Sequence, residues 1–141
     1  MIFGIGIDVL KVDRIERVFT GSEVRARVDR NRIKQVFWNL SDNALRAMPT
    51  GGILTVSLEV VPFWVRIRFR DTGLGFDSKQ GGKIFEPLQS TFVGGTGLGL
   101  AIVRDLTIKY RGTVRVEDPK GGGSCFVVTL PTSHGMAEQD R

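Results

Sequence analysis

The chain has 141 residues, 41% of them hydrophobic, and a formal net charge of +5 at pH 7. This length suits one domain with its own core, and no apolar run approaches the roughly 18 residues that a membrane span requires. Cys125 is the single cysteine, which excludes an internal disulfide and agrees with a cytoplasmic location. The opening residues have no basic region before their apolar stretch, so no secretory signal is expected. The positive charge favours a nucleotide, a nucleic acid or a lipid headgroup as partner, without choosing among them.

Residues 1–21 predict a strand followed by a short amphipathic helix that carries Val12, Ile15, Val18 and Phe19. They resemble the amino terminus of holo-acyl-carrier-protein synthases, in which the aspartate matching Asp8 binds magnesium. No later Lys-Glu-Ala helix completes that site. We therefore expect a lead segment of foreign or engineered origin over 1–21, which packs on the domain or mediates self-association. The main domain then covers 22–131, and a flexible tail covers 132–141.

Residues 29–48 have the apolar periodicity of an amphipathic helix. The expected stripe consists of Ile33, Val36, Phe37, Leu40, Ala44 and Ala47. Asp29 is the expected N-cap, and Pro49 followed after one residue by two glycines ends the helix. Trp38 and Leu45 lie off this stripe. Either they form a contact surface for another element, or a neighbouring loop covers them.

The remaining elements alternate between strands and one more helix. Residues 53–60 and 64–70 alternate in polarity around Pro62, which predicts an antiparallel hairpin with one wet face. Residues 71–97 lack periodicity and predict a long functional loop. A helix over about 98–110 and strands over 113–118 and 124–131 complete an α+β fold. We expect a two-layer sandwich whose mixed, mostly antiparallel sheet has helices on one face.

Three polar residues of the first helix share one side of it. Asn39 and Asn43 are four residues apart, and Arg46 follows three residues later. This stripe borders the apolar one, where idle polar groups are costly. The asparagines either bond nearby backbone or offer oxygen ligands to Mg²⁺, with Arg46 as a cation for phosphate.

Two glycine-rich stretches follow. The stretch DTGLG begins at Asp71, where a strand ends. The Asp71 carboxylate either caps a turn or accepts a hydrogen bond from an amino group of a ligand. GGTGLGLAIV, residues 94–103, places glycines before an apolar helix, which suits either a phosphate cradle or a flexible loop. The glycine spacing matches neither a P-loop nor a Rossmann turn.

In this order, NLSDNALRAM, DTGLGF, IFEPL and GGTGLGLAIV, followed by GGGSCFVVTLP, resemble the N, first glycine, F and second glycine boxes of one family. That family is the catalytic ATP-binding domain of sensor histidine kinases, in the superfamily of gyrase, Hsp90 and MutL. The resemblance covers roughly residues 24–131 and is strongest with nitrogen-regulation-like kinases. It implies a Bergerat-type ATP-binding fold.

The resemblance implies that ATP binds together with Mg²⁺. Asn43 matches the magnesium-binding asparagine, and Asn39 and Arg46 match residues near the phosphates, so these three would be the catalytic residues. Residues 76–96 would form a mobile lid, with Phe85 as its aromatic anchor.

The resemblance also assigns the base pocket and the phosphate cradle. Asp71 would accept the adenine amino group in a pocket shaped by Gly73 and Gly75, and Thr129 on the last strand would reach the adenine. The second glycine box would fold its backbone around the phosphates with Gly95, Thr96, Gly97, Leu98 and Gly99.

Phosphotransfer is favoured over hydrolysis. Relatives that hydrolyse ATP carry a glutamate general base where this chain has Asn39, and a neutral amide cannot accept a proton. Phe92 stands where related lids have a lysine. His134 lies in the polar tail outside any phosphoacceptor motif, so the fragment is not expected to label itself. Its expected partners are a separate helical dimerisation and phosphoacceptor domain and a downstream response regulator.

Two alternatives stay open. A regulatory module that binds nucleotide without phosphotransfer would have the same boxes. Rows of arginines, Arg66, Arg68 and Arg70 among them, also suit a nucleic-acid binder, although Trp64 is the one aromatic interleaved in that row. We expect no nucleic acid partner and no membrane contact by this fragment, whether or not the parent kinase is attached to a membrane.

Overall fold

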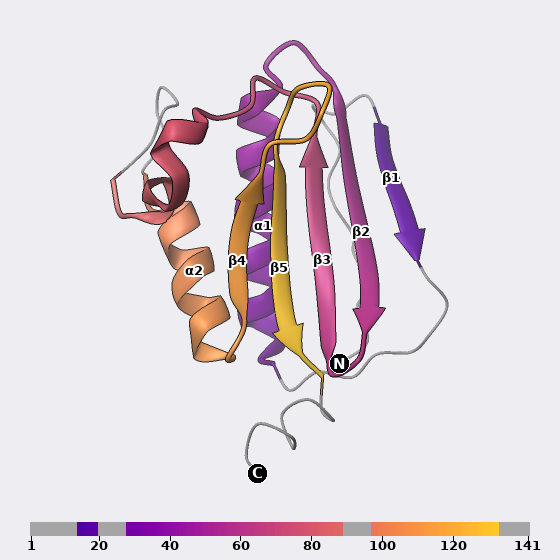
Figure 1. The fold of residues 1–141 in the computed structure, drawn as a ribbon, viewed down its shortest axis with the longest axis vertical. Coiled ribbons are helices and arrows are strands. Elements are labelled where there is room, and N and C mark those ends of the chain that lie inside the picture. Colours follow the sequence, from indigo (N-terminus) through magenta and orange to yellow (C-terminus); the bar gives the residue numbers. More distant parts are fainter. Residues whose placement is uncertain (1–13, 20–27, 89–96, 133–141) are drawn as a thin grey trace.

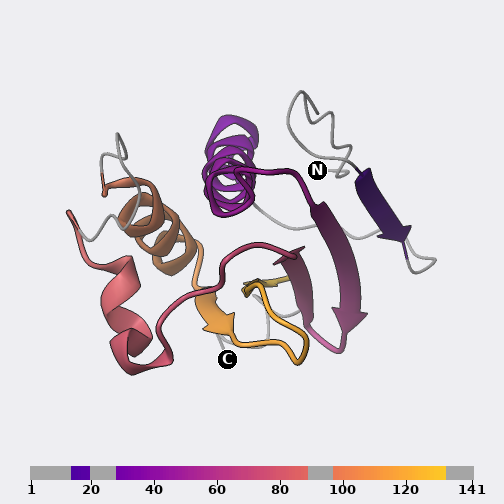
Figure 2. The same ribbon diagram turned by 90° about the horizontal axis from the view of Figure 1, so that it is seen from above.

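A computed structural model describes residues 14–19, 28–88 and 97–132. Figure 1 shows a single sheet with helices packed on one of its faces, and Figure 2 shows the same two layers from above. The elements follow in the order β1 (Arg14–Phe19), α1 (Arg30–Ala47), β2 (Ile53–Val61), β3 (Trp64–Asp71), η1 (Ser78–Phe85), α2 (Gly99–Lys109), β4 (Thr113–Glu117) and β5 (Cys125–Pro131).

The sheet has five strands in the order β1-β2-β3-β5-β4. β1 pairs with β2 in parallel, and the other three pairs are antiparallel. Val61 is paired with Trp64, so Pro62 and Phe63 alone make the turn of the β2–β3 hairpin. The predicted mixed, mostly antiparallel sheet with helices on one face is confirmed.

α1 begins and ends where the sequence pattern places it. The Oδ1 atom of Asp29 accepts from the backbone N–H of Asn31 at 2.8 Å and of Arg32 at 3.0 Å, which satisfies two of the free amides of the first turn. Met48 is the C-cap, two residues before Thr50. All six residues of the predicted stripe are buried: Ile33, Val36, Phe37, Leu40, Ala44 and Ala47.

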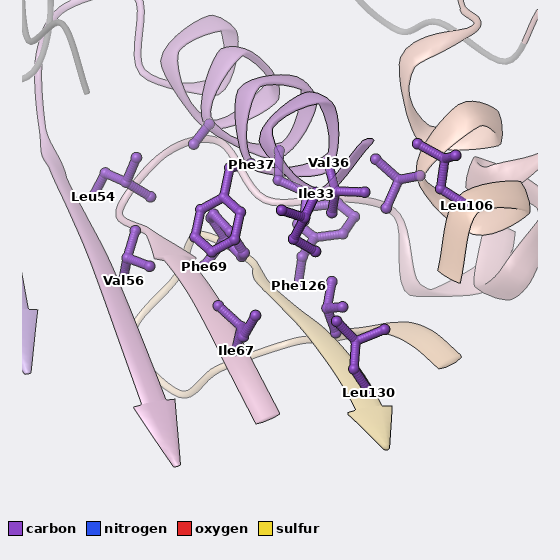
Figure 3. Close-up of a cluster of buried hydrophobic side chains, with 14 of the residues drawn as sticks. Ile33, Val36, Phe37, Leu54, Val56, Ile67, Phe69, Leu106, Phe126 and Leu130 are labelled. Carbon is purple, nitrogen blue, oxygen red and sulfur yellow. The ribbon is translucent and has the colours of Figure 1, made fainter. Parts of the chain in front are cut away.

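The core lies between α1, α2 and the inner face of the sheet, as Figure 3 shows. Phe37 of α1 meets Phe69 of β3 edge to face, with ring centroids 5.1 Å apart. Such pairs add about 0.5–1.5 kcal/mol to the burial of the rings themselves. α1 is therefore fixed on the strand that ends at Asp71.

The predicted helix in the lead segment is wrong over residues 14–19. These residues form β1, which pairs in register with β2 from Arg14 opposite Ile53 to Phe19 opposite Leu58. The open edge of β2 offers a row of backbone partners, and this outweighs the weak helical preference of so short a segment. The predicted first strand and Asp8 lie outside the described residues.

The predicted loop over 71–97 contains a further element. Residues 78–85 form the 3-10 helix η1, capped by Asp77, whose side chain accepts from the N–H of Lys79. α2 follows at Gly99–Lys109, in agreement with the predicted helix. None of the helices in the described ranges is long and apolar enough to cross a membrane.

Phe69 is 1% exposed and supports the packing of α1 on the sheet. Phe69→Ala is expected to lower the free energy of unfolding by about 3–5 kcal/mol, because it removes a buried ring and leaves a cavity. Leu88→Ala, at a side chain 75% exposed, should change it by less than about 0.5 kcal/mol. Urea unfolding measures both, and equal effects would contradict this account of the core.

Candidate functional site

Asp71 is a buried carboxylate at the end of β3, with 1% of its surface exposed. Its Oδ1 atom accepts from the backbone N–H of Gly73 at 2.9 Å and of Ser124 at 3.3 Å. Its Oδ2 atom accepts from the hydroxyl of Ser124 at 2.7 Å. These bonds tie β3, the turn after it and the start of β5 to one side chain.

These hydrogen bonds make the burial of Asp71 tolerable, because a buried charged group without partners is strongly destabilising. A carboxylate has about four lone-pair positions, and three hydrogen bonds occupy this one. The carboxylate therefore keeps capacity for one further donor, such as an amino group of a ligand. The hydrogen bond from the Gly73 N–H confirms that the carboxylate caps the turn after β3, and its contact with a ligand amino group stays a prediction.

The turn after Asp71 fits closely against α1. A Cβ atom on Gly73 would lie 2.3 Å from the carbonyl oxygen of Ala47, and the N–H of Leu74 donates to that same carbonyl at 2.9 Å. Gly123 has φ +76°, and a Cβ atom there would lie 2.0 Å from the carbonyl oxygen of Asp71. Glycine at these two positions lets three backbone segments meet around the carboxylate.

The polar stripe of α1 meets the beginning of α2. The side-chain Nδ2 of Asn39 donates to the carbonyl oxygen of Gly99 at 3.2 Å. Asn43 lies one turn further along α1 and is half-buried, and its amide has no hydrogen-bond partner within the described ranges. Asn39 is thus held at the beginning of α2, and Asn43 follows it by one helical turn on the same side of α1.

The first turn of α2 has no side-chain cap. The first N–H groups of a helix have no partner within the helix, and together with the helix dipole they attract anions. Gly97, Leu98 and Gly99 of the predicted cradle lie at this turn, whereas Gly95, Thr96 and the lid residue Phe92 lie outside the described residues.

Arg46 is engaged by a neighbour on α1. Its Nε atom lies 2.8 Å from Oδ2 of Asp42, one turn earlier, and both side chains are more than two-fifths exposed. An exposed pair of this kind contributes about 0.2–1 kcal/mol, so a phosphate group can displace it at little cost.

Phe85 anchors η1 and offers little surface to a ligand. It is 4% exposed and packs edge to face on Phe126, with ring centroids 6.1 Å apart. Its predicted role as an anchor agrees with this packing, and a direct nucleotide contact does not. A pocket of about 550 Å³ lies beside it, between η1, α2 and β4. Asn39, Asn43 and Asp71 are not among the residues that line this pocket.

The prediction that Thr129 reaches the adenine is wrong. Thr129 is paired with Arg66, five residues before Asp71, which places it roughly 16 Å from that carboxylate along the strand. Its neighbours Val128 and Leu130 belong to the core, so Thr129 lies on the face away from the helices. The residue that reaches Asp71 is Ser124, directly before β5, and sequence reasoning missed it.

A signal for Ser124 was present in the sequence. It directly follows the glycines of GGGSC and precedes the last strand, and an antiparallel pairing of that strand with β3 brings it to Asp71. Whether this serine meets the aspartate thus depends on the register with which the last strand pairs with β3.

The family model of histidine kinase-, DNA gyrase B-, and HSP90-like ATPases matches residues 28–134. Sporulation kinase C of Bacillus subtilis is 38% identical over 103 residues, which are 73% of this chain and 24% of that kinase. The chain therefore spans about a quarter of the length of the curated relatives it matches.

Solved structures agree with this match. The mycobacterial sensor histidine kinase MprB aligns with a TM-score of 0.74 at 29% identity, over 84% of this chain and 82% of that one. Histidine kinase ThkA, in a complex with the response regulator protein TrrA, aligns with a TM-score of 0.70 at 29% identity, over 84% of this chain and 34% of that one. These comparisons confirm the resemblance and the fold class expected from the sequence.

Ser124→Ala removes the hydroxyl that donates to Oδ2 of Asp71. We expect a loss of about 1–3 kcal/mol in the free energy of unfolding, because the buried carboxylate loses a partner. Ser57→Ala is the matched control on β2, where a change below about 0.5 kcal/mol is expected. Chemical unfolding of both variants checks this, and an unchanged stability of Ser124→Ala would contradict the clamp on Asp71.

Proposed function

This chain belongs to the family of histidine kinase-, DNA gyrase B- and HSP90-like ATPases, and we propose that it transfers the γ-phosphoryl group of ATP to a histidine on a separate helical domain. It is homologous to the catalytic domains of sensor histidine kinases, which are protein-histidine kinases. ATP binding follows from the family.

The residues around Asp71 support its proposed role as the adenine reader. Its remaining acceptor capacity suits the exocyclic amino group of adenine. Gly73 and Gly75, which the resemblance assigns to the base pocket, pack against the carbonyls of Ala47 and Gly123 and so hold the turn beside the carboxylate. Leu74 and Leu98, which are 78% and 43% exposed, flank the same end of the fold and offer apolar surface. Burial of the carboxylate strengthens its interaction with a donor by excluding water.

Asn43 is the residue that we propose as the protein ligand of Mg²⁺. In the described ranges no group of three His, Cys, Asp or Glu side chains could hold a metal ion. Mg²⁺ needs few protein ligands when phosphate oxygens supply the others, and a half-buried amide that has no hydrogen-bond partner among the described residues suits this requirement. When bound, Mg²⁺ neutralises charge on the phosphates.

The observation that carries phosphotransfer over hydrolysis is the environment of Asn39. Its amide donates to the Gly99 carbonyl at the entrance to α2, next to the proposed phosphate cradle. A neutral amide cannot take a proton from water, so water is poorly activated there. An imidazole nitrogen needs no such base: its lone pair attacks phosphorus as the bond to the ADP oxygen breaks.

The acceptor must come from another domain or chain. We propose a helical dimerisation and phosphoacceptor domain, followed by a response regulator. ThkA was solved in a complex with a response regulator, which supports the second partner by similarity. Trp38 is 65% exposed on α1 and offers an apolar side chain that suits helical docking, while Leu45, seven residues later, is half-buried and packs against the core.

A regulatory module that holds ATP without transferring phosphate would have the same pocket. The neutral Asn39 is compatible with both functions, so nucleotide binding alone does not separate them. Turnover in the presence of a histidine acceptor does.

The test uses γ-labelled ATP with the chain alone and with a phosphoacceptor hairpin from a related kinase supplied in trans. We expect no self-labelling, negligible hydrolysis, and slow, concentration-dependent labelling of the hairpin that is acid-labile and stable to base. Asn43→Ala or chelation of Mg²⁺ should abolish the transfer. Asp29→Ala, which affects only the helix cap, should leave it intact in the folded protein.

Brisk hydrolysis by the chain alone would contradict the kinase assignment and favour an ATPase. ATP binding without labelling of any supplied acceptor histidine would favour the regulatory module.

A further inference from the structure

The tip of the β2–β3 hairpin is apolar throughout. Residues 60–64 read VVPFW, with no polar side chain at a surface turn, where polar residues are usual. Phe63 is 49% exposed and Val60 is 39% exposed. Pro62 is exposed as well, while Val61 and Trp64 are half-buried. Contiguous exposed apolar side chains mark a contact surface.

Phe63 also occupies a backbone position that favours glycine. Pro62 and Phe63 are the two central residues of the turn, and Phe63 has φ +67°. A turn with proline first and a positive φ second has the type II pattern, in which glycine is the preferred second residue. A large exposed aromatic side chain at such a position is not explained by folding.

The hairpin tip lies at the end of the domain opposite the nucleotide site. The Ala47 carbonyl accepts from Leu74, which places the end of α1 beside the end of β3. The beginning of α1 is therefore at the level of the start of β3 (Figure 1). Trp64 is the first residue of that strand. The hydroxyl of Tyr110 accepts from the N–H of Asp29, so the end of α2 lies there too.

We call this part of the fold the hairpin end and define it as residues 28–34, 60–65, 105–113 and 129–132. It contains two acidic residues, Asp29 and Asp105, and five basic ones: Arg30, Arg32, Lys34, Lys109 and Arg111. The first turn of α1 has no acidic side chain, although the helix dipole favours one there. Ile108, on the last turn of α2, is 61% exposed.

We propose that the hairpin end binds an anionic lipid bilayer, with Phe63 and its apolar neighbours inserted among the lipids and the basic residues of both helices on the headgroups. The tip is apolar and the helix termini are positive, which matches a bilayer that is apolar beneath an anionic surface. The helix termini and the hairpin tip are presented at one end of the molecule, so a flat surface meets both together (Figure 1).

From the sequence we expect no membrane contact by this fragment, and no helix in the described ranges is a membrane-spanning segment. A surface hairpin needs none, because partial insertion of a few side chains with electrostatic attraction is enough for reversible binding. The proposed site shares no residue with Asn39, Asn43 or Asp71, so membrane binding leaves the nucleotide site free.

The test is co-sedimentation of the whole chain with vesicles of phosphatidylcholine alone or mixed with phosphatidylglycerol. We expect binding to the mixed vesicles only, and release by added salt. Phe63→Gly should lower the partition coefficient about tenfold or more, since it removes the inserted ring. Arg32→Glu should lower it about fivefold or more, since it reverses a charge at the headgroups.

Two controls separate binding from folding. Trp38→Ala removes an exposed aromatic side chain of α1 outside the hairpin end and should leave vesicle binding unchanged. Arg32→Glu places an acidic residue in the first turn of α1, so its Tm should not fall. A fluorescent ATP analogue should bind all variants equally, so the outcome is independent of the proposed kinase function.

Absence of binding to the mixed vesicles would overturn the proposal. Equal binding to neutral vesicles, or unchanged binding by both Phe63→Gly and Arg32→Glu, would overturn it as well.

Discussion

The carboxylate of Asp71 is the group around which this domain is arranged. It ends the central strand β3, and it is buried with hydrogen bonds from Gly73 and from both the backbone and the hydroxyl of Ser124. These bonds fix two backbone segments, the turn at Gly73 and the residue before β5, so the surroundings of this carboxylate are preformed. The close approach of Gly73 to Ala47 extends the same constraint to the end of α1.

The helices transmit this constraint to the proposed phosphate site. α1 is fixed on β3 through Phe37 and Phe69, and its Asn39 holds the first residue of α2. The contact between Tyr110 and Asp29 joins the opposite ends of the two helices. The uncapped first turn of α2 is therefore held at a set position relative to Asp71, which suits a ligand with a base at one end and phosphates at the other.

Much of this arrangement could be predicted from local patterns. α1 has its N-cap in Asp29 and a continuous apolar stripe, so its bounds and its buried face follow from the sequence. Asp71, Asn39 and Asn43 stand in recognisable boxes, so they could be proposed as site residues from the sequence.

The errors concern pairings between distant segments. Thr129 and Ser124 are both small hydroxyl residues near the last strand, and only the register with β3 distinguishes which of them meets Asp71. Residues 14–19 are too few for their pattern to distinguish a helix from a strand. The pattern was compatible with an amphipathic helix, but these residues pair with the edge of β2 as a strand. The 3-10 helix η1 contains two adjacent glycines, which are unfavourable in helices, so the sequence pattern predicted an irregular loop there.

The central claim is that Asp71 reads the adenine base through its remaining acceptor capacity. Titration of a fluorescent ATP analogue against the wild type and Asp71→Asn tests it most directly, with circular dichroism to verify that the variant is folded. The account predicts a Kd at least about tenfold higher for the variant, because a charged acceptor of the amino group is lost. Equal affinity of the two proteins, both folded, would contradict it.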